Sequence, residues 1–194
     1  MLNKPVDEIM FGADGRAWAI RSENEIARAK QIIGDASYFD KSMTRVVGQV
    51  IRSICILNHP IPNTNNAESI QIILPAAQLK RKNDIYICMV SNAHNVCSEN
   101  HYIAIVSTTV ETTNPMAEVA AGIKLLGTVL ERFDAVTDLY EPVDNGSKSA
   151  CFISKSYDAA SHFESAAVDV LRMYECLTGE KLDMSIAPDL EEGA

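Results

Sequence analysis

The chain has 194 residues, and 47% of them are hydrophobic, so it is long enough to bury a globular core. Its formal net charge of −9 argues against a general nucleic-acid binder, because such proteins gather Lys and Arg against the phosphate backbone. A membrane span needs about eighteen consecutive apolar residues, and neither such a run nor a secretory leader is present. We therefore expect a soluble, cytoplasmic protein.

The first half of the sequence predicts β-strands separated by turns. Residues 8–11 and 17–21 flank Asp14 and Gly15, a dipeptide that favours a hairpin turn. This half of the chain is therefore expected to be rich in strands. Further strands are predicted at residues 29–34, 48–57 and 70–74.

Residues 83–112 contain two apolar runs joined by a polar loop. In IYICMV (residues 85–90) and YIAIV (residues 102–106), apolar residues occupy consecutive positions, as in strands covered on both faces. The loop between them is rich in Asn, Ser and His, which tolerate turn conformations. The segment is predicted to be a hairpin in the interior of a sheet.

The first of two predicted helices comes after this hairpin. Asn114 is placed to cap it, and Pro115 suits the first helical position, where its missing N–H costs nothing. Apolar residues then recur at steps of three and four, which predicts one packed face and one solvated face. These apolar residues are Met116, Val119, Ala120, Ile123, Leu126, Leu130 and Phe133.

The second helix is predicted to begin at a capping box of Ser161 and Glu164 and to end at Gly179. Short strands are expected at residues 136–140 and 151–154, between the two helices. The apolar stripe of the second helix consists of Phe163, Ala167, Val170, Leu171 and Tyr174.

No repeat or linker divides the sequence. We therefore expect one domain of residues 1–182, and then an acidic segment, residues 183–194, that frays.

His94, Cys97 and His101 lie in one loop at spacings that zinc accepts, but a fourth ligand is missing nearby. The alternative, which we favour, is that this loop hydrogen-bonds to itself. Asp158 and His162 are placed four residues apart, as in an oriented imidazole that acts as a general base. No activated nucleophile accompanies them, so helix capping is the favoured role for this pair.

Lys80, Arg81 and Lys82 form a basic cluster in an acidic chain. It is interpreted either as a surface for an acidic partner or as a solvated turn, and the turn is favoured. The segment Asn145-Gly146-Ser147 matches a glycosylation acceptor but is interpreted as a turn. No glycine-rich phosphate-binding motif is present. The cysteines, interpreted as reduced structural thiols, are Cys55, Cys88, Cys97, Cys151 and Cys176.

Several segments, in the same order along the chain, resemble the Rab GDP-dissociation inhibitors. They are MLNKPVDEI, SENEIARAKQII, VGQVIRSICILNHPIPNTN, SKSYDAASHFE and the hairpin of residues 83–112. Members of this family are cytosolic proteins that hold prenylated Rab GTPases in the GDP state. The related Rab escort proteins share the architecture, but the compact spacing here resembles the inhibitor branch more closely.

The resemblance implies an α/β fold with the three-layer β/β/α architecture of flavoproteins, strand-rich and with two main helices. Family members are considerably longer than this chain. Their first part carries a glycine motif that no longer serves a cofactor and a helical domain that shelters the prenyl tail, and the chain resembles only their C-terminal part. Exposed apolar faces and self-association are expected where that first part would pack.

The resemblance also implies a binding protein without catalytic residues, metal or cofactor. Its partners are prenylated Rab GTPases in the GDP state. Of the surface that contacts the GTPase switch regions, Met1 and Leu2 are the residues that map onto this sequence. The alternatives are a substrate-domain fragment of a flavin-dependent oxidoreductase and a fragment of a Rab escort protein.

Overall fold

The computed structural model describes residues 4–160 and 163–185, and these fall into two compact units. The chain passes between the units within two long strands, β5 (Thr44–Leu57) and β9 (Glu131–Pro142), and again after Lys155 and after Ser165. The prediction of a single domain over residues 1–182 stays a prediction. Unit 1 comprises Met1–Arg45, Glu141–Lys155 and Ala166–Ala194, and unit 2 comprises Val46–Tyr140 and Ser156–Ser165.

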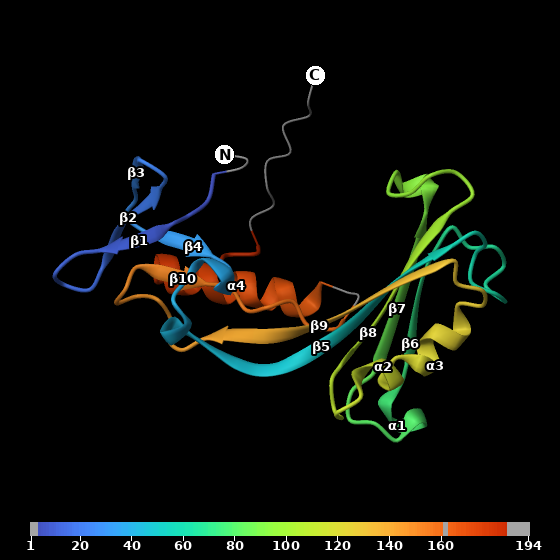
Figure 1. Cartoon of the computed structure of the whole chain (residues 1–194). Helices are drawn as coiled ribbons and strands as arrows, with labels where there is room; N and C mark the ends of the chain where they lie inside the picture. Colours follow the sequence, from blue (N-terminus) through green and yellow to red (C-terminus); the bar gives the residue numbers. More distant parts are fainter. Residues whose placement is uncertain (1–3, 161–162, 186–194) are drawn as a thin grey trace. The chain divides into compact units, whose positions relative to one another are not determined.

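Unit 2 is built on a five-stranded sheet in the order β6-β7-β8-β5-β9 (Figure 1). Neighbouring strands from β6 to β5 pair antiparallel, and the register places Ile87 between Ile72 and Val106. The predicted hairpin of residues 83–112 is confirmed as β7 and β8, which are interior strands. The bounds of these strands are β6 (Ser69–Leu74), β7 (Ile85–Ser91) and β8 (Tyr102–Thr109).

One face of this sheet carries the core of unit 2. Fully buried side chains from β5, β7 and β8 pack there against two short helices, α2 (Pro115–Glu118) and α3 (Ala120–Leu125). Gly122 allows α3 to lie close to the sheet, because a Cβ there would come within 2.5 Å of Val106 Cγ1. A third short helix, α1 (Ala76–Leu79), joins β6 to β7.

The other face of the sheet is only partly covered, so the prediction that both faces of β7 and β8 are buried is wrong. Side chains in β7 alternate between buried and half-buried. Ile54 and Ile105, which are opposite each other on β5 and β8, are 43% and 37% exposed. The consecutive apolar residues therefore place apolar side chains on both faces of the sheet, but only one of these faces is well covered.

The first predicted helix is much shorter than the sequence suggested. Its start at Pro115 is confirmed, but the Asn114 side chain makes no capping hydrogen bond. Gly127 turns the chain with a φ of +79°, and the N–H of Leu130 then donates to the carbonyl of Ile56 at 2.8 Å. Leu130 therefore lies outside the helix, and Phe133 belongs to β9. In the sequence, the helical spacing of apolar residues continues beyond the end of the helix because β9 also contains apolar residues.

Unit 1 shows the predicted β/β/α layering, and the strand-rich α/β class is confirmed (Figure 1). An antiparallel sheet in the order β1-β2-β3 packs on a parallel pair, β4 and β10, through a small core that includes Phe39, Cys151 and Ile153. Helix α4 lies against β10, because Arg172 donates to the carbonyl of Ile153 at 3.1 Å. The elements are β1 (Glu8–Phe11), β2 (Ala17–Ser22), β3 (Glu25–Arg28), β4 (Ile32–Gly34), β10 (Cys151–Ile153) and α4 (Glu164–Thr178).

Two details of unit 1 differ from the sequence prediction. The strand expected at residues 29–34 shortens to β4, and β3 was not predicted because all four of its residues are exposed and carry little apolar signal. The end of α4 at Gly179 is confirmed, with a φ of +81°. Ser161 of the predicted capping box and most of the acidic segment 183–194 lie outside the described residues. No helix among the described residues is long and apolar enough to cross a membrane.

Candidate interaction surfaces

The residues predicted to contact the GTPase, Met1 and Leu2, lie outside the described residues. Their role stays a prediction. His162, the partner of Asp158 in the catalytic hypothesis, also lies outside them.

Asp158, the other residue of that pair, forms a hydrogen bond with the backbone nearby. The Asp158 carboxylate accepts a hydrogen bond from the N–H of Ala160 at 2.8 Å. Arg52 holds the same segment against the open face of the unit 2 sheet, because its guanidinium donates to the carbonyls of Tyr157 and Asp158. This arrangement fixes the chain just before α4 and shows no feature of a general base.

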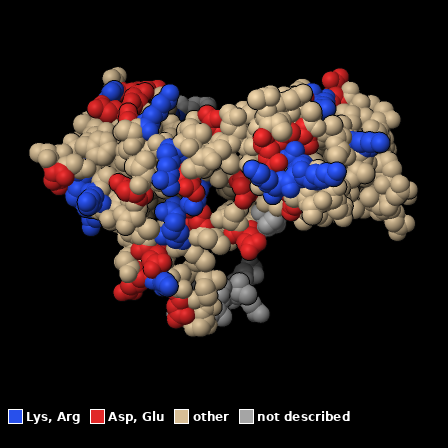
Figure 2. Space-filling view, turned by 90° about the horizontal axis from the view of Figure 1, so that it is seen from below, with Lys and Arg blue, Asp and Glu red and all other residues tan. Residues whose placement is uncertain are grey.

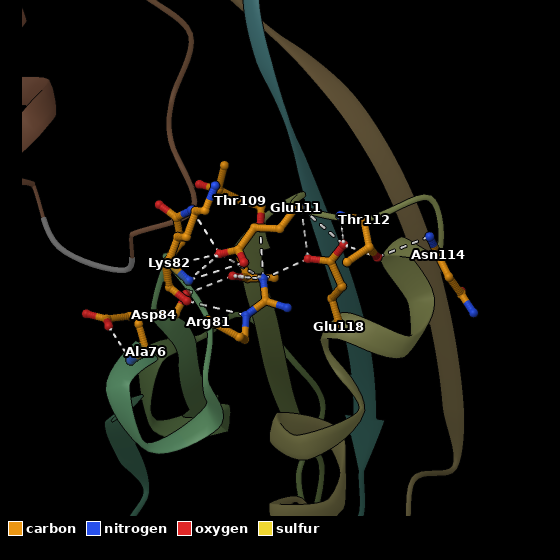
Figure 3. A network of polar contacts seen from close by, with 11 residues as sticks. Ala76, Arg81, Lys82, Asp84, Thr109, Glu111, Thr112, Asn114 and Glu118 are labelled. Carbon is orange, nitrogen blue, oxygen red and sulfur yellow. Dashed lines mark hydrogen bonds and ion pairs between the residues drawn. The ribbon is translucent and has the colours of Figure 1, made fainter.

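A buried ion pair closes one end of the unit 2 sheet (Figure 3). Arg81 precedes β7 and Glu118 ends α2, and Arg81 Nη2 lies 2.7 Å from Glu118 Oε2. The two side chains are only 12% and 3% exposed. Arg81 also donates to the carbonyl of Thr109 at 3.2 Å, so one guanidinium ties three chain segments together.

Glu118 is the acceptor at the centre of this network. Its carboxylate accepts hydrogen bonds from the N–H of Glu111 at 3.0 Å and from both the N–H and the hydroxyl of Thr112 at 2.7 Å. Burial raises the pKa of Glu118, but the hydrogen bonds from Thr112 and Arg81 outweigh it, so the pKa lies below its usual value. Glu118 is therefore charged, and its hydrogen bonds connect the end of α2 to the residues that follow β8.

Glu111 extends the network to the chain after α1. Its carboxylate accepts hydrogen bonds from the N–H groups of Lys82 and Asn83, at 3.0 and 2.6 Å (Figure 3). The favoured interpretation of the basic cluster as a solvated turn is thus wrong for Arg81, whose side chain is nearly buried and paired with Glu118. Lys80 and Lys82 remain exposed.

No local feature of the sequence indicated this network. Adjacent residues of a helix point in different directions, so the apolar Val119 gives no sign that Glu118 is buried. Arg81 was an available cation, but nothing in the spacing of the two residues indicated that they pair.

The loop proposed for zinc is held by its own hydrogen bonds. His101 Nδ1 lies 3.0 Å from both Ser98 Oγ and the carbonyl of Glu99, and the Cys97 thiol donates to the carbonyl of His101. Across residues 4–160 and 163–185, no three His, Cys, Asp or Glu side chains are arranged to hold a metal ion. His94, Cys97 and His101 are therefore not brought together as ligands.

Three of the cysteines occupy apolar surroundings, and the structure shows all five as free thiols. Burial raises the pKa of the thiols of Cys55, Cys88 and Cys151. Such thiols stay protonated at neutral pH and are poor nucleophiles. This is the behaviour of the structural thiols predicted from the sequence.

Helix α4 presents an apolar surface to solvent. The predicted stripe does not pack on the sheet: Phe163, just before the helix, is 85% exposed, while Asp169 and Arg172 face β10. The expected exposure of apolar side chains on the final helix is confirmed. The exposed apolar residues are Phe163, Val168, Val170, Leu171 and Tyr174, which we call the α4 stripe.

A second apolar region, in unit 1, is a hollow of about 830 Å³ between the β1-β2-β3 sheet and β4. Ile9, Ile20, Ile32 and Phe39 line it, and the buried hydroxyl of Ser22 beside it has no hydrogen-bond partner among the described residues. Charged residues elsewhere are mixed: on the face shown in Figure 2, Lys and Arg lie among Asp and Glu. Both units therefore expose apolar side chains: unit 1 on α4 and in this hollow, and unit 2 on the open face of its sheet, where Ile54 and Ile105 lie.

The comparisons with known proteins agree with this architecture. The family model named GDP dissociation inhibitor matches residues 1–188. The probable secretory pathway GDP dissociation inhibitor 1 of Schizosaccharomyces pombe is 55% identical, over 99% of this chain and 43% of that protein. Rab GDP dissociation inhibitor beta of Rattus norvegicus is 50% identical, over 94% of this chain and 41% of that protein.

Solved structures give the same result. The crystal structure of a Rab GDI from Plasmodium falciparum has a TM-score of 0.89 at 46% identity, over 93% of this chain and 42% of that one. An oxidoreductase from Methanosarcina mazei has a TM-score of 0.52 at 14% identity, which shows a shared fold alone.

The fold and these matches define a strand-rich α/β chain with a flavoprotein-like architecture. The chain belongs to the GDP dissociation inhibitor family, and it spans 43% and 41% of the two named relatives. The relatives carry the names of inhibitors, so the oxidoreductase and escort-protein alternatives are not favoured.

Proposed function

We propose that this chain is part of a Rab GDP dissociation inhibitor that acts in the cytoplasm. Such a protein binds prenylated Rab GTPases in the GDP state, slows GDP release and recycles them between membrane and cytosol. The observation that carries the proposal is the family match over residues 1–188, supported by relatives with 50% and 55% identity. The chain has no catalytic role in this proposal and needs no cofactor.

Within this function, the described residues act mainly as scaffold. The α2–β8 end of unit 2 is held by an internal ion pair, so its charges are engaged within the chain. The proposed GTPase contact lies at Met1 and Leu2, at the start of the chain that leads into β1.

The experiment compares GDP release from prenylated, GDP-loaded Rab in the presence of this chain and of a full-length relative. Slower release with the relative is the positive control. Slower release with this chain, weakened by Leu2→Asp and unaffected by Glu99→Ala, would support the proposal. Unchanged GDP release with this chain, in an assay where the relative slows release, would contradict Rab binding by this chain, and a yellow, flavin-loaded chain would favour an enzyme.

Self-association forms the second part of the proposal. Contiguous exposed apolar side chains favour association in water, and the α4 stripe is such a surface. Light scattering during gel filtration is expected to give a mass above that of one chain. A monomer at all accessible concentrations would contradict this part without affecting the Rab assignment.

A further inference from the structure

The turn between β9 and β10 contains an Asn-Gly pair in an unusual hydrogen-bonding environment. Asn145 is exposed to solvent, whereas Gly146 is buried and has a φ of +79°. A Cβ at Gly146 would come within 2.2 Å of the Cys151 carbonyl oxygen, so this position requires glycine. Glycine also carries no side chain that would hinder attack by its own backbone nitrogen.

Two donors converge on the side-chain carbonyl of Asn145. Its Oδ1 accepts hydrogen bonds from the Ser147 hydroxyl at 2.8 Å and from the Ser147 N–H at 3.1 Å. Donors in this arrangement polarise a carbonyl and stabilise negative charge that develops on its oxygen. The Asn145 amide carbon is therefore made more electrophilic.

A carboxylate lies beside the nitrogen of the next residue. The N–H of Gly146 donates to Asp144 Oδ1 at 2.8 Å. A carboxylate at hydrogen-bond distance from an N–H is placed to accept its proton. The turn thus places a base next to the Gly146 nitrogen and two donors on the Asn145 carbonyl oxygen.

We propose that Asn145-Gly146 is a site of spontaneous deamidation. The Gly146 nitrogen attacks Asn145 Cγ and its proton passes to Asp144, while negative charge develops on Oδ1 and is stabilised by Ser147. The tetrahedral intermediate expels the side-chain nitrogen as ammonia, which takes up a proton, and leaves a cyclic imide. Water then opens the imide at either carbonyl, so the product is aspartate or isoaspartate.

The site lies where a backbone change has consequences for unit 1. Arg16 donates to the carbonyl of Ser147 at 3.0 Å, and the N–H of Ala17 donates to the carbonyl of Ser149 at 2.8 Å. An isoaspartate adds a carbon to the backbone immediately before these contacts. Deamidation is therefore expected to weaken the attachment of β2 to the chain leading into β10.

The test is incubation of the purified chain at neutral pH and body temperature, and then trypsin digestion. Cleavage after Arg132 and Lys148 releases residues 133–148, in which Asn145 is the asparagine. Chromatography and mass spectrometry then measure conversion to the acid, and heavy-oxygen water marks hydrolysis that occurs during the incubation. Asn63, Asn65 and Asn66, which precede Thr, Asn and Ala, are internal controls.

Conversion of Asn145 to a mixture of aspartate and isoaspartate, faster than at the internal controls, is expected. Ser147→Ala and Asp144→Asn should each slow it by about fivefold, the rate equivalent of one typical hydrogen bond. Ser147→Thr, which keeps the hydroxyl, should restore the rate. Thermal unfolding checks that each variant folds.

Two results would overturn the proposal. The first is an Asn145 as stable as the internal controls. The second is equal conversion in the folded chain, in both variants and in the free synthetic peptide, which would show that the turn geometry has no part in it.

Discussion

The two units of this chain differ in the size of their buried cores, although both expose some apolar side chains. Unit 2 places Ile85, Ile87 and Met89 of β7 beneath α2 and α3, with no exposed area, and closes the end of its sheet with the Arg81–Glu118 pair. Unit 1 has a smaller core and leaves most of the α4 stripe in solvent. Burial, and with it stability, is therefore concentrated in unit 2.

The difference begins with what covers each sheet. In unit 2, two short helices seal one face of five strands. In unit 1, the parallel pair β4–β10 has only two strands, and Ile33 on β4 is 61% exposed. Parallel strands are stable when both faces are covered, so the exposed side of this pair is suited to further contacts.

The largest effect is expected from Glu118→Ala, and a mild effect would contradict the assignment of stability to unit 2. The substitution removes the nearer of the two carboxylates that pair with the buried Arg81, leaving Glu111 at 3.5 Å, and it removes the acceptor for three hydrogen bonds of Glu111 and Thr112. Loss of one partner of a buried pair costs about 3–5 kcal/mol. Urea unfolding measures it, with the exposed Glu99→Ala as control. A loss similar to that of the control would show that the pair is not structural.

The next prediction compares one isoleucine from each unit. Ile87→Ala in β7 should lower the free energy of unfolding by about 2–5 kcal/mol, because it leaves a cavity in a closed core. Ile33→Ala in β4 should change it by less than about 0.5 kcal/mol, because the side chain is already exposed. Equal losses in the two variants would mean that unit 1 buries Ile33 in solution.

These contrasts were only partly predictable from the sequence. The interior hairpin of unit 2 was predicted with nearly correct bounds, because long apolar runs between polar turns are a strong local signal. The α4 helix was also predicted, but the face that packs was not. Amphipathic spacing assumes that the apolar side faces the core, and here Asp169 and Arg172 take that place.

The polar network could not be predicted because its members are far apart in the sequence. Arg81 and Glu118 meet only when the chain after α1 is brought against the end of α2. The interrupted first helix has a similar cause. Its end at Gly127 depends on the pairing of Leu130 with β5, a contact that local periodicity does not report.

A smaller effect is expected from pH and would test the charge state of Glu118. Its pKa in the folded chain lies below the usual value of 4.5, so its stabilising contribution is complete above that value. The contribution is lost as the pH falls below 4.5 and through the lowered pKa, because the protonated acid no longer holds Arg81. Unfolding measured from pH 7 to pH 3 should show a steeper loss in the native chain than in Glu118→Gln. Parallel curves would place the acid sensitivity elsewhere.

The smallest change in stability, and the clearest separation of the two units, is expected from Val170→Glu in the α4 stripe. Val170 is exposed, so the free energy of unfolding should shift by less than about 0.5 kcal/mol. The new charge would nevertheless disrupt apolar contact between copies, and light scattering should show a lower mass. Ser165→Glu adds the same charge to α4 outside the stripe and should leave the mass unchanged.

If both variants lowered the mass equally, net charge would govern the association. If neither variant lowered the mass, the stripe would not be the surface through which copies associate. A lower mass for Val170→Glu alone would assign folding stability and association to different units.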